Sequence, residues 1–189
     1  MAYRTLVPII NDCMTAENRA DVLALLTRAQ ADEAVLTFHG VYACDMPRLT
    51  ENIAFLRKNG LDVSLWVGHT FGHTGDEFAF AEKELPFQRI VRRDGAPFGS
   101  PFCPLDRGFQ TAVAERLAAI AARSGVRRIL LDDDCCLAQK GFGCTCEAHM
   151  ARLRAELGED ISREELTRRV FSGRGSRSRD AWRKVQGES

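Results

Sequence analysis

Four short apolar runs, each followed by a stretch with helical periodicity, constrain the fold of this chain more than any other feature. Runs of this length, bounded by polar or glycine-containing turns, predict strands that are buried on both faces of a parallel sheet. Strands that alternate with helices predict an α/β fold with right-handed crossovers. The predicted strands are Leu6–Ile10, Ala34–Phe38, Val63–Val67 and Arg128–Leu131.

Apolar residues at helical spacing follow these runs. A plausible N-cap at Thr15 precedes the first stripe, and a capping box formed by Ser162 and Glu165 precedes the last. The predicted helical stripes lie within residues 22–29, 49–58, 109–120, 150–157 and 166–170.

Two segments interrupt the alternation. Residues 70–105 are rich in glycine, proline and phenylalanine, and they predict a long ordered excursion. Residues 172–180 predict a flexible basic loop. The whole chain, residues 1–189, is long enough for one domain with a sizeable core, and we expect a single α/β domain.

Two architectures fit this pattern. The first is a half-barrel, the first four β/α units of a (β/α)8 TIM barrel, whose full length is typically about 250 residues. The alternative is a small open doubly wound parallel sheet. Both gather the carboxyl ends of the strands at one face, where α/β proteins place their chemistry.

Three adjacent carboxylates, Asp132, Asp133 and Asp134, follow the fourth predicted strand. Strand alternation places Asp132 and Asp134 on one face. Mutual repulsion raises the pKa of such a cluster, as a general acid requires. We therefore predict that these residues are catalytic. The alternative is an acidic loop that caps the next helix.

Polar and aromatic side chains at or near the ends of the other strands predict a substrate site. Each also has a structural explanation. A histidine can satisfy loop backbone groups, a mid-strand tryptophan is more often core, and an Asn-Asp pair can cap the next helix. The residues predicted to bind substrate are Asn11, Asp12, His39, Trp66, His69 and His73.

Seven cysteines, an odd number, argue against a full disulfide framework and favour a reducing compartment, which we take to be the cytoplasm. Cys144, Cys146 and His149 are metal-ligand types, although their spacing departs from C-x2-C. We expect no cofactor and keep a structural zinc at these residues as the alternative to buried thiols. Candidates for a fourth ligand are Cys135, Cys136 and Asp134.

The charge balance excludes two classes of partner. Acidic and basic residues number 26 each, so no electrostatic argument supports binding to nucleic acid or an anionic membrane. No apolar run is long enough to span a bilayer, and the first eight residues lack the pattern of a secretory signal.

Four segments, in order, resemble a group of bacterial glycoside-hydrolase-like TIM barrels. In that group a W…GH segment ends the third strand, and a CP segment precedes the third helix. A DDD segment ends the fourth strand, and a CxC…H loop follows it. The matching segments, within a resemblance spanning residues 5–185, are Ser64–Gly75, Pro101–Asp106, Ile129–Asp134 and Gly143–His149.

The resemblance implies a barrel that hydrolyses a glycosidic bond in a carbohydrate with carboxylates. Two departures qualify it. Cys135 to Leu137 stand where the group carries an aromatic or basic residue. Glycosidases use two carboxylates, and one normally comes from a later strand than the fourth. We therefore expect a fragment that is incomplete for catalysis alone and that self-associates through exposed strand edges.

Two other functions remain open. Leu36 to Gly40 resemble the TFDDG motif of metal-dependent polysaccharide deacetylases, and His69 to His73 fit their H-[ST]-x-x-H metal motif. Two histidines and an aspartate would hold zinc and activate water. Against this, His39 stands where an acid is expected. The third alternative is a non-catalytic sugar-binding barrel.

Overall fold

The computed structural model describes residues 3–38, 40–41, 44–68, 85–131, 143–171 and 176–187, with the backbone alone for 99–101. The chain divides into two compact units. Unit 1 comprises residues 1–70 and 113–132, and unit 2 comprises residues 71–112 and 133–189. A compact unit need not fold alone, so the single domain expected over residues 1–189 stays a prediction.

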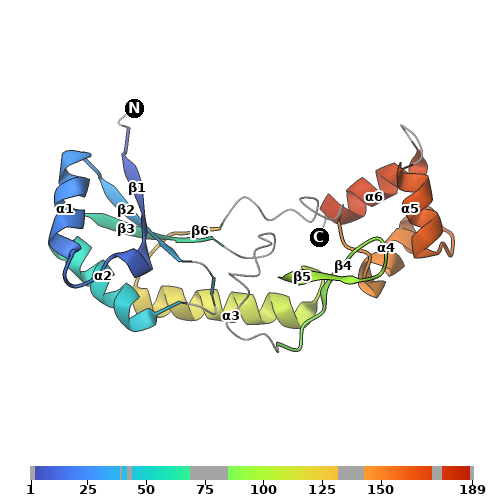
Figure 1. The fold of residues 1–189 in the computed structure, drawn as a ribbon, viewed down its shortest axis with the longest axis horizontal. Helices are drawn as coiled ribbons and strands as arrows, with labels where there is room; N and C mark the ends of the chain where they lie inside the picture. Colours follow the sequence, from blue (N-terminus) through green and yellow to red (C-terminus); the bar gives the residue numbers. More distant parts are fainter. Residues whose placement is uncertain are drawn as a thin grey trace. The chain divides into compact units, whose positions relative to one another are not determined.

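Unit 1 is built on a four-stranded parallel sheet (Figure 1). Its strands lie in the order β1-β2-β3-β6. The order of these four strands in the sheet is therefore the same as their order along the chain. The predictions of four parallel strands and of an α/β fold are confirmed. The bounds are β1 Leu6–Ile10, β2 Glu33–Phe38, β3 Asp62–Val67 and β6 Ile129–Leu131.

The two central strands are buried because their sequences are apolar on both faces. Leu36 of β2 and Leu65 of β3 are fully buried, and they pair directly in register. The outer strands leave apolar side chains in solvent, notably Ile10 of β1 and Leu131 of β6, each 48% exposed. The side chains of the two central strands are therefore better shielded from solvent than those of the outer strands.

Short helices connect the strands of unit 1. These are the 3-10 turn η1 Asn11–Cys13, α1 Arg19–Arg28 and α2 Met46–Lys58. The carboxylate of Asp45 caps α2 by accepting a hydrogen bond from the backbone N–H of Arg48. The predicted cap at Thr15 is wrong for α1, since Asn18 occupies its N-cap position. Helix α3, Arg107–Ser124, contributes residues to both units.

Unit 2 contains an antiparallel hairpin of β4 Arg89–Val91 and β5 Pro97–Phe102. It is the described part of the excursion expected over residues 70–105. Gly95 makes the turn with φ of 88°, and the carboxylate of Asp94 accepts a hydrogen bond from the N–H of Ala96. Phe102, the last residue of β5, packs with Phe87 and Phe109, and the three ring centroids lie 5.3–5.7 Å apart.

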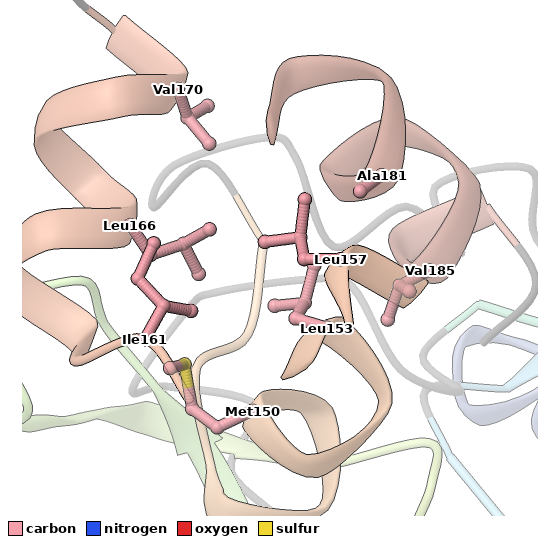
Figure 2. Close-up of a cluster of buried hydrophobic side chains, with 8 residues drawn as sticks. All are labelled: Met150, Leu153, Leu157, Ile161, Leu166, Val170, Ala181 and Val185. Atoms are coloured by element: carbon pink, nitrogen blue, oxygen red, sulfur yellow. The ribbon is translucent and has the colours of Figure 1, made fainter. Parts of the chain in front are cut away.

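Three helices complete unit 2: α4 Glu147–Leu157, α5 Arg163–Phe171 and α6 Arg177–Gly187. Their apolar faces meet in one core (Figure 2), because each carries aliphatic residues at helical spacing. The Ser162 hydroxyl accepts a hydrogen bond from the N–H of Glu165, which confirms the predicted start of α5. The eight side chains of this core are Met150, Leu153, Leu157, Ile161, Leu166, Val170, Ala181 and Val185.

The flexible basic loop expected over residues 172–180 differs in its second part. Residues 172–175 lie outside the described residues, whereas α6 begins at Arg177. Ser178 and Ala181 are buried in the helix core, and this burial accounts for the order. Among the described helices, none is both long and apolar enough to cross a membrane.

Candidate metal centre

Most of the predicted catalytic and substrate-binding residues lie outside the described residues. This holds for Asp132, Asp133 and Asp134 and for three histidines, His39, His69 and His73. Their roles stay predictions.

The structure does describe Asn11, Asp12 and Trp66. Asn11 is fully buried, and its side-chain oxygen accepts a hydrogen bond of 3.0 Å from Asn52 of α2. That contact gives Asn11 a structural role in joining the end of β1 to α2. Asp12 is exposed in η1. Trp66 is half-buried, and its indole N–H has no hydrogen-bond partner among the described residues.

Four potential metal ligands meet in the interior of unit 2. They are the thiols of Cys103, Cys144 and Cys146 and the imidazole of His149. All four side chains are at most 2% exposed, and their ligand atoms all lie within 4.8 Å of one another. Apolar residues of the hairpin surround them, including Ile90, Val91 and Phe98. This buried Cys3His cluster is the candidate site.

Four of the six distances between the ligand atoms are close to those around a tetrahedrally coordinated ion, and the other two are at most 4.8 Å. The sulfur of Cys103 lies 3.6 Å from that of Cys146 and 3.9 Å from that of Cys144. Nδ1 of His149 lies 3.5 Å from Cys103 and 3.3 Å from Cys146. With zinc–sulfur bonds of about 2.3 Å, tetrahedral sulfurs stand about 3.8 Å apart, and sulfur and nitrogen about 3.6 Å apart. The four atoms therefore surround space for one such ion.

Two structural elements bring the ligands together. Cys103 follows β5 directly, and its N–H donates to the carbonyl of Gln88 at 2.7 Å, which continues the hairpin. Cys146 is the N-cap of α4, and His149 lies in the first turn of that helix. Between the cysteines, the N–H of Thr145 donates to the carbonyl of Val91 at 2.8 Å. The Cys-Thr-Cys segment thus lies along the hairpin before it enters α4.

Helices α5 and α6 hold the same segment from the other side. The amide of Gln186 makes two hydrogen bonds to the backbone of Cys144, donating to its carbonyl at 3.0 Å and accepting from its N–H at 2.8 Å. The guanidinium of Arg163 donates to the carbonyl of Thr145. Gly143 adopts φ of 96°, and an added Cβ there would lie 2.5 Å from Gln186 Oε1. Only glycine permits this close approach.

Backbone N–H groups point at the sulfurs. The N–H of Val91 donates to the sulfur of Cys144 at 3.4 Å. The N–H groups of Leu105 and His149 also donate hydrogen bonds, to the sulfurs of Cys103 and Cys146 respectively. Donors of this kind stabilise thiolates, and the amino end of α4 adds a positive dipole at Cys146. These surroundings therefore stabilise negatively charged sulfur atoms.

The three thiols nevertheless do not ionise together. Contact with Cys144 and Cys146, with burial, raises the pKa of Cys103. Cys103 lowers the pKa of Cys144, but Cys146 and burial outweigh it and raise that pKa to about 11. Hydrogen bonds from Cys103, Cys144 and His149 lower the pKa of Cys146. The lowered pKa favours a thiolate at Cys146, and a divalent cation would supply the charge that also stabilises thiolates at Cys103 and Cys144.

Sequence reasoning found three of the four residues and missed Cys103. The fourth-ligand candidates Cys135, Cys136 and Asp134 lie outside the described residues, and the structure places Cys103 in that position instead. The sequence offered one indication of Cys103. It lies between Pro101 and Pro104, within the segment that was predicted to be a long ordered excursion.

A comparison with models of known protein families found no match, and a comparison with curated proteins found none either.

Proposed function

We propose that this chain is a zinc-binding protein and that its zinc is structural. The observation that carries the proposal is the contact of three thiols and one imidazole, all buried, with ligand atoms within 4.8 Å of one another. The ligands would be Cys103, Cys144, Cys146 and Nδ1 of His149. Such an ion would join the end of the β4–β5 hairpin to the start of α4.

The donor set favours zinc over other ions. Three thiolates and an imidazole in a tetrahedral array suit zinc, whereas calcium and magnesium require oxygen ligands. Iron–sulfur chemistry shares the ligand types, but ligand atoms within 4.8 Å of one another leave room for a single ion and not for a cluster.

A structural role fits better than a catalytic one. Four protein ligands complete the tetrahedron, whereas catalytic zinc keeps one position open for water or substrate. The cluster is also closed to solvent, because its four side chains are at most 2% exposed. Binding free energy at such a site contributes directly to folding.

Metal analysis of the purified protein tests the proposal. We expect one zinc per chain, and we expect Cys103→Ser to lose it. Cys13→Ser is the matched control, since Cys13 is exposed and lies outside the cluster. Zinc that persists in Cys103→Ser, or a protein that binds no zinc under reducing conditions, would contradict the proposal.

A carbohydrate-directed hydrolase is the second candidate, and the sheet supports it. The order β1-β2-β3-β6 has no reversal along the sheet. A doubly wound sheet reverses its order at a switch point, whereas the strands of a barrel follow one another. This order favours the first four units of a TIM barrel over the open-sheet alternative. The resemblance to glycoside-hydrolase-like barrels then suggests hydrolysis of a glycosidic bond by the Asp132–Asp134 cluster.

Hydrolysis of a panel of aryl glycosides tests this second candidate. We expect Asp132→Asn and Asp134→Asn to abolish any turnover, with Asp21→Asn on α1 as the control. Sugar binding without turnover by the unaltered chain would favour the sugar-binding alternative. Zinc that is lost on changing His69 or His73, but retained in Cys103→Ser, would favour the deacetylase.

A further inference from the structure

A cavity of about 760 Å³ opens in unit 1 at the amino ends of β2, β3 and β6. This edge of the sheet is opposite the carboxyl ends, where the predicted hydrolase residues follow the strands. Neither the zinc proposal nor the hydrolase proposal uses it. The volume is within the range of small-molecule sites in proteins.

Arginines dominate the lining of this cavity. Four of them, Arg4, Arg57, Arg127 and Arg128, face two carboxylates, those of Glu33 and Asp62. The lining therefore carries two more positive charges than negative ones. The whole chain has no net charge, so this cavity is a local concentration of positive charge.

The two carboxylates neutralise part of this positive charge by forming ion pairs. Glu33 is 2% exposed and pairs with Arg128 and Arg4, and Asp62 pairs with Arg4. Arg57 is held separately: it donates to the carbonyls of Ser124 at 3.3 Å and Gly125 at 2.9 Å. Its guanidinium is thus fixed at the cavity without any carboxylate partner among the described residues.

One lining group is left without a partner. Arg127 is exposed, and it makes no ion pair or hydrogen bond within the part of the chain that the structure describes. Ser64, by contrast, is 1% exposed, and its hydroxyl lies beside the Glu33 carboxylate, whose pKa it helps to lower.

We propose that this cavity binds a phosphate group carried by a small molecule, with Arg127 and Arg57 as its ligands. Guanidinium groups match phosphate oxygens in geometry and charge. The excess of two positive charges balances a phosphate dianion. The cavity is larger than inorganic phosphate requires, so the remaining volume would hold the organic part of the ligand.

A stabilising ion-pair network is the competing explanation. It accounts for Glu33 with Arg128 and Arg4. It leaves Arg127 without a role, and it predicts no ligand.

Titration of ¹⁵N-labelled protein followed by amide chemical shifts tests the proposal with the unaltered chain. The probes are inorganic phosphate, glucose 6-phosphate and glucose. We expect saturable shifts at Ser64, Gly125 and Arg127 with both phosphates, tighter binding of glucose 6-phosphate, and none with glucose. Absence of saturable shifts with either phosphate would overturn the proposal. Tighter binding of inorganic phosphate would overturn the organic part of it.

Two variants test the named ligands. Arg127→Ala and Arg57→Ala should each weaken phosphate binding by about tenfold, which is typical of one lost hydrogen bond to a charged group. Arg28→Ala, an exposed arginine on α1 outside the cavity, should bind as the unaltered chain does. Equal weakening in all three would indicate non-specific charge and overturn the assignment.

Discussion

At the scale of single residues, Gly143 beside the candidate metal centre leaves no room for a side chain. Its φ of 96° and the 2.5 Å approach to Gln186 both exclude a side chain. We expect Gly143→Ala to lower the free energy of unfolding by about 2–4 kcal/mol, because strain and a clash act together. Urea denaturation measures this change.

Gly158 provides the matched control. It has φ of 71°, but an added Cβ would meet nothing within 4 Å. Gly158→Ala should therefore cost only the backbone strain, about 1 kcal/mol. Equal losses at the two glycines would contradict a packing role for Gly143.

Glu33 makes stability depend on pH. Burial would raise its pKa, but the Ser64 hydroxyl and the Arg128 and Arg4 guanidiniums more than offset this and hold it below the ordinary value of 4.5. A depressed pKa stabilises the folded state above pH 4.5, and this contribution is lost as the pH falls through the folded-state value. Glu33→Gln should therefore be less stable at neutral pH, with a gap that narrows as the medium becomes acidic.

Thermal unfolding from neutral to acidic pH measures that gap. A constant difference between Glu33→Gln and the unaltered chain would contradict the ionised state assigned to Glu33. Glu51→Gln is a suitable control, because its carboxylate pairs with Arg19 while 65% exposed and should change stability little.

At the scale of elements, the edges of the parallel sheet are where we expect copies of the chain to associate. Ile10 on β1 is 48% exposed, and an edge strand offers unpaired backbone groups. If copies associate through this edge, Ile10→Lys should shift the protein toward monomer in sedimentation velocity. Leu25→Lys on α1 is the control, since Leu25 is 55% exposed away from the sheet. A monomeric unaltered chain would contradict the expectation.

The sequence predicted elements where local patterns decide them. The four strands follow from apolar runs such as Val63–Val67, and α5 follows from the capping box at Ser162. The β4–β5 hairpin was not predicted as strands, because its residues lack the alternation of a half-buried sheet. Cys103 was missed for a different reason. It meets Cys144 across 41 positions of sequence, a contact that no local pattern records.

At the scale of the whole molecule, the two compact units should respond differently to loss of metal. The proposed zinc lies entirely in unit 2, where it would join the hairpin to α4. We expect chelation to reduce hydrogen-exchange protection at Val91 and in the first turn of α4, while Leu36 and Leu65 of unit 1 keep theirs. Equal loss in both units would contradict a local structural role.

X-ray absorption at the zinc edge of the purified protein tests whether the Cys3His cluster is a closed structural zinc site. The Cys3His centre requires three sulfur ligands at about 2.3 Å and one nitrogen at about 2.0 Å, with no bound water. That spectrum, with one sulfur replaced in Cys103→Ser or the metal lost, is the result we expect. A first shell of nitrogen and oxygen alone, or a bound water in place of a sulfur, would contradict a closed structural zinc site.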